Sequence, residues 1–260
     1  MIKIKIKGGL LVVLGLCLCL QLMAQDTPAV KTDSTKAKRD IPVDINLQVR
    51  SLYTWRGFKV SNAPITDIDM HYNLTKDKAL RVGIWGASSF TGDYTEFDYF
   101  VSYNKNNYSF SIWDVNNFSD FPNANLFNYN PRSTSHFVDV RAGYKFGDAF
   151  PLSMDWTTIV LGRDTHVKSN GDVSNSYSNY VELGYRLFKE GSTELHAFVG
   201  GGFAFGREQN FYGEKANIVN AGLTINKDLV LFNYHMPIAA TAMFNPEKKH
   251  GALQLVVNVF

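Results

Sequence analysis

The feature that most constrains this chain is an alternation of apolar and polar residues with a period of two, which begins near Asp44 and continues to the end. Neighbouring side chains on a strand point to opposite faces, so each alternating segment is a strand with one apolar and one polar face. The pattern recurs in twelve segments, and the segments are 45–55, 67–74, 79–90, 94–104, 107–117, 134–146, 152–163, 176–188, 193–205, 216–226, 229–243 and 250–260.

The connectors between these segments also alternate, between short turns and longer polar loops. An even number of strands, with short connectors at one end and long ones at the other, is typical of outer-membrane barrels. After the N-terminal leader, no stretch approaches the roughly 18 consecutive apolar residues that a membrane-spanning helix needs. The sequence therefore predicts an all-β fold, a single closed antiparallel transmembrane β-barrel of about 12 strands, with both termini on the periplasmic side of the bacterial outer membrane.

The first residues have the three parts of a secretory signal peptide. Lys3, Lys5 and Lys7 form a basic segment, an apolar run follows from Gly8 to Leu20, and cleavage is expected after Ala24. The next stretch is rich in Lys, Asp, Thr and Pro, which favours disorder. The predicted organisation is a signal peptide over 1–24, a disordered periplasmic leader over 25–43 and the barrel over 44–260.

Charge and cysteine usage exclude several classes of function. Removing the three leader lysines lowers the basic residues from 26 to 23, against 24 acidic residues, so no electrostatic case for nucleic acid exists. Cys17 and Cys19 leave with the signal peptide, which excludes disulfide and thiolate chemistry in the mature chain. His71, His196 and His235 share the polar face without a close ligand spacing, so we expect no metal site and no cofactor.

Aromatic residues make up 14% of the chain, and many fall where strands would meet the lipid headgroups. Such girdles predict contact with membrane lipid and lipopolysaccharide. The final strand ends in an aromatic residue, the kind of ending that we expect the barrel-assembly machinery to recognise. The predicted membrane-interface aromatics are Tyr53, Trp55, Tyr72, Tyr103, Tyr144, Tyr185 and Phe260.

The polar faces carry nearly equal numbers of basic and acidic residues, which suits either a wet pore or a lumen filled by paired charges. Arg56 and the acids Glu96 and Asp98 share the lumenal face, so we predict that Arg56 pairs with one of these acids across the lumen. Arg50 and Arg81 are the alternative cations. The predicted lumen constriction is Arg50, Arg56, Arg81, Glu96 and Asp98.

Two features leave other functions open. Ser135 and His136 near the outer rim could serve a lipid-modifying enzyme, but no Gly-x-Ser-x-Gly occurs, so we predict no catalytic residues and no enzyme. The loop 118–133 mixes Asn with four aromatic residues, which suits a binding surface, a plug inside the lumen or packing on its neighbours.

Four short motifs carry a family resemblance. Tyr53-Thr54-Trp55-Arg56-Gly57, followed by Ser61 and Pro64, resembles the first-hairpin motif of the TorF-type putative porins. The segments Gly83–Ser89, Glu96–Tyr99 and Tyr180–Tyr185 are similar to later strands of that family. The resemblance covers mainly 44–120 and implies an outer-membrane barrel, in a family whose transport role is not established.

Together these patterns predict a porin-like channel that passes small solutes across the outer membrane with weak selectivity. The alternative is a barrel with a closed lumen and a structural or ligand-binding role.

Overall fold

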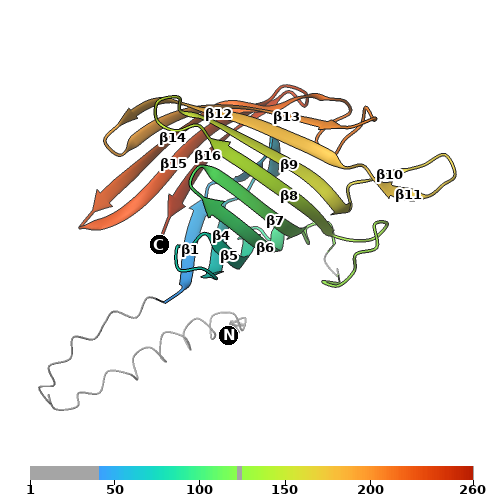
Figure 1. The fold of residues 1–260 in the computed structure, drawn as a ribbon, viewed down its shortest axis with the longest axis horizontal. Helices are drawn as coiled ribbons and strands as arrows, with labels where there is room; N and C mark the ends of the chain where they lie inside the picture. The colour runs from blue at the N-terminus through green and yellow to red at the C-terminus, as the bar shows by residue number, and fades with distance from the viewer. Residues whose placement is uncertain (1–40, 122–124, 260) are drawn as a thin grey trace, which may run out of the picture. The chain divides into compact units, whose positions relative to one another are not determined.

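The computed structural model describes residues 41–121 and 125–259. From Val43 onward the chain forms a closed antiparallel barrel of twelve strands in the ring order β1-β16-β15-β14-β13-β12-β9-β8-β7-β6-β5-β4 (Figure 1). The barrel strands are β1 (Val43–Arg50), β4 (Ile65–Asn73), β5 (Leu80–Ser89), β6 (Thr95–Lys105), β7 (Tyr108–Asn116), β8 (His136–Lys145), β9 (Leu152–Gly162), β12 (Ser178–Glu190), β13 (Thr193–Ala204), β14 (Asn217–Leu231), β15 (Tyr234–Asn245) and β16 (His250–Asn258).

Consecutive strands pair, so the fold of an all-β, twelve-strand antiparallel barrel is confirmed. The predicted signal peptide and residues 25–40 of the predicted leader lie outside the described residues, and β1 begins at Val43. The order of the strands gives the barrel two different ends. We call the end with the connectors 74–79, 106–107, 146–151, 191–192 and 232–233 the turn end, and the opposite end the loop end. The described part of the barrel starts and finishes at the turn end, and its periplasmic orientation stays a prediction.

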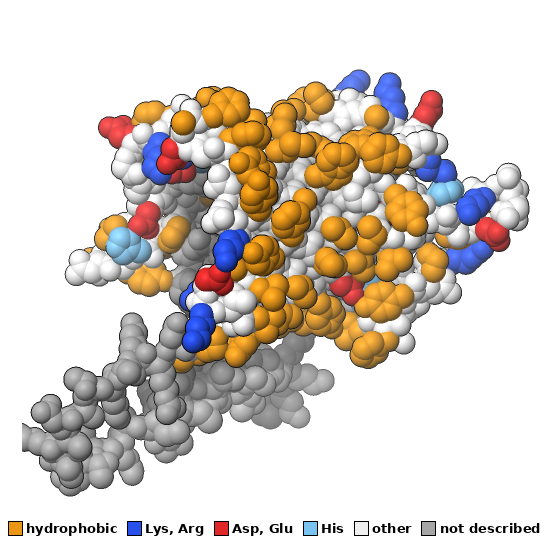
Figure 2. Space-filling model, viewed as in Figure 1, with side chains coloured by type: hydrophobic (Ala, Val, Ile, Leu, Met, Phe, Trp, Pro, Cys, Tyr) orange, Lys and Arg blue, Asp and Glu red, His pale blue; other side chains and the backbone are white. Residues whose placement is uncertain are grey.

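The outer face of the barrel is rich in exposed apolar side chains, and Figure 2 shows them spread over the side in view. Large hydrophobic side chains stand exposed on successive strands at every second position, as the period of two requires. Among the described residues, no helix has the length and apolar character to cross a bilayer. The exposed outward-facing residues include Val43, Ile45, Met70, Tyr72, Val82, Tyr99, Val101, Tyr103, Phe110, Ile112, Val140, Leu183, Tyr185, Val199, Leu223, Ile225, Leu253 and Leu255.

The first predicted strand is divided in two by the structure. The wall strand β1 ends at Arg50, and the next residues form a separate hairpin of β2 (Tyr53–Trp55) and β3 (Phe58–Ser61). Tyr53 is buried and Trp55 half-buried inside this hairpin's packing, so their prediction as membrane-interface aromatics is wrong. Continued alternation past Arg50 gave no sign of this break.

The other predicted interface aromatics lie on the wall. Tyr72, Tyr103 and Tyr185 are exposed on the outer face, and Tyr144 is half-buried against Tyr108, with the two ring centroids 4.7 Å apart. Phe260 lies outside the described residues. Contact of these rings with lipid stays a prediction.

The hairpin of β14 and β15 is longer than the alternation indicates. A turn was expected at Lys227–Asp228, but the strands pair as far as Leu231 and Tyr234 and turn at Phe232–Asn233. Both turn residues have positive φ, 52° and 66°, which is the geometry of a tight two-residue hairpin turn.

Asp114, an acid on the outer face of β7, has two polar partners for its carboxylate. His136 on β8 lies 2.8 Å from one carboxylate oxygen, and the Tyr129 hydroxyl donates to the other at 2.5 Å. The Tyr129 ring also packs on the His136 ring, 4.6 Å away between centroids. The described part of loop 117–135 therefore packs on the wall, where it covers a carboxylate that would otherwise face an apolar surface.

Candidate functional site

The strands β2 and β3 are joined by a tight turn of two residues with positive φ. Trp55 pairs with Phe58, and between them Arg56 and Gly57 have φ values of 47° and 85°. Two successive residues in this region make a two-residue hairpin turn, in which glycine at the second position is free of strain. The turn points the Arg56 side chain away from β1, the wall strand that precedes the hairpin.

Arg56 crosses the barrel to the opposite wall. Its Nη1 atom donates to Asp139 on β8 at 3.1 Å, and Nη2 donates to Thr157 on β9 at 3.0 Å. Because β9 lies six places from β1 in either direction around the ring, these bonds span the lumen. The hairpin therefore folds inward and divides the interior of the barrel.

The Arg56 guanidinium is held by a buried cluster. Tyr212, from the loop between β13 and β14, accepts a further hydrogen bond at 2.9 Å, and the Trp55 ring lies 4.5 Å from the guanidinium carbon. Asp139 has no solvent exposure and also accepts a hydrogen bond from Arg141 at 2.7 Å. A buried hydrogen bond to a charged group contributes about 1.5–3 kcal/mol, so the crossing contact helps to fix the hairpin.

The hairpin tip also touches the wall beside β1. The Gly57 carbonyl accepts a bond from Asn245 of β15 at 3.1 Å. A Cβ at Gly57 would lie 1.9 Å from the Val219 carbonyl oxygen on β14, so only glycine fits. Thr54 donates to Gln254 on β16 at 3.0 Å, and Gln254 donates to the Leu52 carbonyl at 2.7 Å. The tip is thus pinned on both sides of the lumen.

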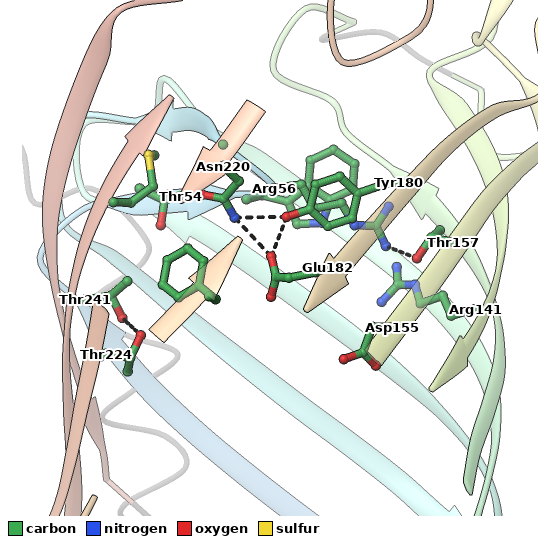
Figure 3. A pocket seen from close by; sticks show the side chains of 14 residues that line it. Thr54, Arg56, Arg141, Asp155, Thr157, Tyr180, Glu182, Asn220, Thr224 and Thr241 are labelled. Carbon is green, nitrogen blue, oxygen red and sulfur yellow. Dashed lines mark hydrogen bonds between the residues drawn. The ribbon is translucent and has the colours of Figure 1, made fainter. Parts of the chain in front are cut away.

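A polar cavity of about 410 Å³ lies on the turn-end side of the hairpin (Figure 3), and we call it the turn-end cavity. Tyr180, Glu182 and Asn220 form one network on its wall, in which the Asn220 amide donates to the Tyr180 hydroxyl at 2.9 Å and to the Glu182 carboxylate at 3.1 Å. Tyr180 itself donates to Glu182. Asp155 and Arg141 face the same space, which can hold water and small polar solutes.

A second cavity, of about 400 Å³, lies on the loop-end side, and we call it the loop-end cavity. Trp55 lines both cavities, so the hairpin lies between them. Aromatic rings dominate its walls, and it is lined by Tyr53, Trp55, Phe58, Lys59, Val60, Glu96, Val115, Asn117, Asp120, Phe137, Arg163 and Phe211.

The predicted pairing of Arg56 with Glu96 or Asp98 is wrong, because the inward turn points Arg56 at β8 and β9 rather than β6. Asp98 is buried and accepts the backbone N–H of Asn116 at 3.1 Å. Glu96 lines the loop-end cavity instead. Both acids are lumenal, but neither shares the Arg56 cluster.

The two alternative cations lie elsewhere on the wall. Arg50 donates to Asp67 from Nε at 2.6 Å and from Nη2 at 3.0 Å, and the Trp85 indole donates to Asp67 at 3.2 Å. Arg81 stands opposite Asn73 and Ser102 near the turn end, several residues from the hairpin. The five predicted constriction residues are therefore spread over the lumen and do not form one site.

Sequence reasoning missed the residues that receive the hairpin. Tyr212 and Thr157 were not singled out, and Tyr212 comes from a loop that turns inward where an outer loop was expected. One signal was available. A two-residue turn at Arg56-Gly57 between two aromatic residues is a hairpin pattern rather than the end of a long strand.

The residues considered for catalysis and metal binding do not meet. Ser135 donates to Asn116 at 2.5 Å, while His136 faces Asp114, so these neighbours in sequence point to different partners. Within the described ranges, no group of three His, Cys, Asp or Glu residues is arranged to hold a metal ion.

No family model matches the chain, and no curated protein does either. Solved barrels do resemble it. A mutant of the Rh. blastica porin is 12% identical with a TM-score of 0.37, covering 75% of this chain and 54% of that one, so this chain spans about half of the porin's length.

Two further structures align over longer shares of both chains. An outer membrane channel from Pseudomonas putida F1 is 14% identical with a TM-score of 0.44, covering 90% of this chain and 98% of that one. Salmonella typhi OmpF in complex with daunomycin is 7% identical with a TM-score of 0.37, covering 83% and 96%. Similarities this distant identify no solute for this chain, and the TorF-type resemblance stays a prediction.

Proposed function

We propose that this protein is an outer-membrane channel for small solutes, narrowed where the β2–β3 hairpin crosses the lumen. The observation that supports this proposal is that two cavities, of about 410 and 400 Å³, lie on either side of the hairpin and share Trp55 in their lining. A passage through the barrel has to pass this hairpin, and Trp55 borders it on both sides. The hairpin therefore sets the width of the passage.

The membrane location rests on the wall. A closed barrel leaves no unpaired sheet edge, and every backbone group of its strands can be satisfied inside a bilayer. Its outward apolar side chains form an extensive exposed surface, and monomeric soluble proteins rarely expose so large an apolar surface. Weak ion selectivity follows from the mixture of basic and acidic side chains along the lumen.

Planar-bilayer recording tests the proposal. The purified barrel should give small, reproducible conductance steps. Replacing Trp55–Phe58 by Gly-Ser-Gly-Ser removes the tip but keeps the Leu52 and Thr54 contacts to the wall, and should enlarge the steps. The matched control makes the same replacement at residues 168–171, the exposed tip of the hairpin formed by β10 (Thr165–Val167) and β11 (Val173–Asn175), and should leave the steps unchanged.

A closed lumen with a binding role is the second candidate, because aromatic packing fills much of the loop-end half. Buried residues such as Phe137, Tyr180 and Tyr212 form one continuous cluster with the hairpin. A folded barrel that is silent in bilayers, together with a tip-replaced variant that conducts, would establish this candidate in place of the channel. A heat-dependent shift in gel mobility shows in each case that the barrel is folded.

A further inference from the structure

The loop-end cavity has the size and lining of a small-molecule site. Its volume of about 400 Å³ lies within the roughly 300–1,000 Å³ that such sites occupy. Five aromatic rings line it, and so do two acids and two bases. The rings are Tyr53, Trp55, Phe58, Phe137 and Phe211, and the charged residues are Lys59, Glu96, Asp120 and Arg163.

Glu96 is a buried carboxyl group that has no cationic partner among the described residues. Its side chain is on the lumenal face of β6, and the residue is only 8% exposed. The Tyr94 hydroxyl and the Asn117 side chain are its neutral polar neighbours, and among the described residues no cation pairs with it within 4.0 Å. A buried carboxylate whose charge no cation balances is costly, so this position is suited to a ligand's ammonium group.

Arg163 is the complementary group on the other side of the cavity. Its Nε atom is buried and has no hydrogen-bond partner in the part of the chain that the structure describes. The guanidinium stands over the rings of Phe137 and Phe211, at 5.4 and 6.0 Å from their centroids. Burial lowers the pKa of Arg163, and Glu96 and Asp120 oppose that change without pairing with it. A guanidinium fork of this kind is suited to a carboxylate.

We propose that the loop-end cavity binds a small zwitterion with an apolar side chain, the chemistry of a free aromatic amino acid. The ammonium group pairs with Glu96, the carboxylate pairs with Arg163, and the side chain packs on the aromatic wall beside Trp55. Two acids and two bases in the lining make a net-neutral ligand the best match. This inference rests on the proposed function, because it names the class of solute that the channel takes.

Calorimetry on the folded barrel in detergent tests binding directly. L-phenylalanine carries both charges, 2-phenylethylamine lacks the carboxylate, and 3-phenylpropionate lacks the ammonium group. We expect L-phenylalanine to bind about 10- to 100-fold more tightly than either analogue, since each analogue leaves one buried charge unpaired. Equal affinities for the three compounds, or no detectable binding of L-phenylalanine, would overturn the proposal.

Two substitutions assign the charges to their residues. Glu96→Gln should weaken L-phenylalanine and 2-phenylethylamine but leave 3-phenylpropionate unchanged, and Arg163→Gln should weaken L-phenylalanine and 3-phenylpropionate but leave 2-phenylethylamine unchanged. Glu190→Gln makes the same chemical change at an exposed position of the turn end and should not alter binding. Folding of each variant is checked by its gel mobility before and after heating. Loss of all three ligands in the folded Glu96→Gln variant would contradict the assignment.

Binding and conductance separate this inference from the channel proposal. Conductance steps without selective binding of L-phenylalanine would overturn the inference and leave the channel. Selective binding without conductance would overturn the channel and keep the site as that of a closed, ligand-binding barrel.

Discussion

Arg56 and Asp139 form an ion pair at 3.1 Å. Arg56 belongs to the hairpin that follows β1, and Asp139 belongs to β8 on the far side of the barrel. Asp139 is fully buried and is shared with Arg141 on its own strand. A polar contact in the middle of the lumen therefore holds the hairpin that divides it. The stability of the barrel and the width of its interior depend on the same carboxylate.

Replacing Arg56 by Ala should lower the free energy of unfolding by about 1.5–3 kcal/mol, because buried Asp139 would lose one of its two cationic partners and keep Arg141. The hairpin would also be released, so conductance should rise. Urea unfolding in detergent, followed by tryptophan fluorescence, measures the first effect, and bilayer recording measures the second. Lys168→Ala, which removes an exposed cation from the tip of the β10–β11 hairpin, is the control. Unchanged stability in Arg56→Ala would show that the crossing pair contributes nothing.

Gly57→Ala should displace the hairpin tip. The new Cβ would lie 1.9 Å from a backbone carbonyl of β14, and the residue has a φ of 85°. Gly92→Ala is a matched control, since Gly92 has a φ of 77° but nothing within 4 Å of a new Cβ, and backbone strain alone costs roughly 1–2 kcal/mol. We expect a larger loss of stability and a larger conductance in Gly57→Ala than in Gly92→Ala. Equal behaviour of the two variants would argue against close packing of the tip.

Tyr129→Phe should release part of the 117–135 loop from the wall. The variant loses the hydrogen bond to the Asp114 carboxylate but keeps the ring that packs on His136. Limited proteolysis with trypsin should then cut after Arg132 several times faster, on the order of up to tenfold for one exposed charged hydrogen bond. Tyr234→Phe, an exposed tyrosine at the other end of the barrel, should leave the cleavage rate unchanged. The idea fails if both variants are cut at the same rate.

The turn between β4 and β5 should respond to acid. Hydrogen bonds from Thr75 and then Lys105 lower the pKa of Asp77 from 3.8 to about 2. A lowered pKa in the folded state means that the charged form stabilises the fold above the unfolded value, and that this contribution is lost as pH falls from about 4 to about 2. The Asp77→Asn variant should therefore have a lower melting temperature than the wild type at pH 7, and the same melting temperature at pH 2. A melting-temperature difference that persists at pH 2 would contradict this origin.

The wall of the barrel could be predicted because its signal is local. The alternation within each segment shows which residues of that strand face lipid and which face the lumen. Twelve such segments therefore predict the number and order of the strands without any knowledge of pairing. The error at the first strand has the same origin. A hairpin inside the lumen also alternates, and Tyr53 and Trp55 continue the parity of the wall strand before them. Only the two-residue turn at Arg56-Gly57 distinguishes the two structures.

The interior was harder to predict because its contacts depend on closure. Parity places Arg56, Glu96 and Asp139 on lumenal faces, but which acid Arg56 meets is decided by the turn and by the position of each strand in the ring. The Gly200–Gly202 segment gives another example. Wall glycines suggest bending, yet Gly200 and Gly202 make room for the rings of Tyr180 and Tyr212, which lie where Cβ atoms would be. Which rings fill such spaces is set by residues distant in sequence.

The strands that close the ring share few residues. Among the described residues β1 and β16 pair at three positions, and the hairpin and the two residues before it add contacts from the inside through Thr54, Leu52 and Ser51. Trimming this loop would thus open the conduit and loosen the join between the first and last strands together. One segment thus serves both the division of the interior and the closure of the ring, so its length is constrained twice.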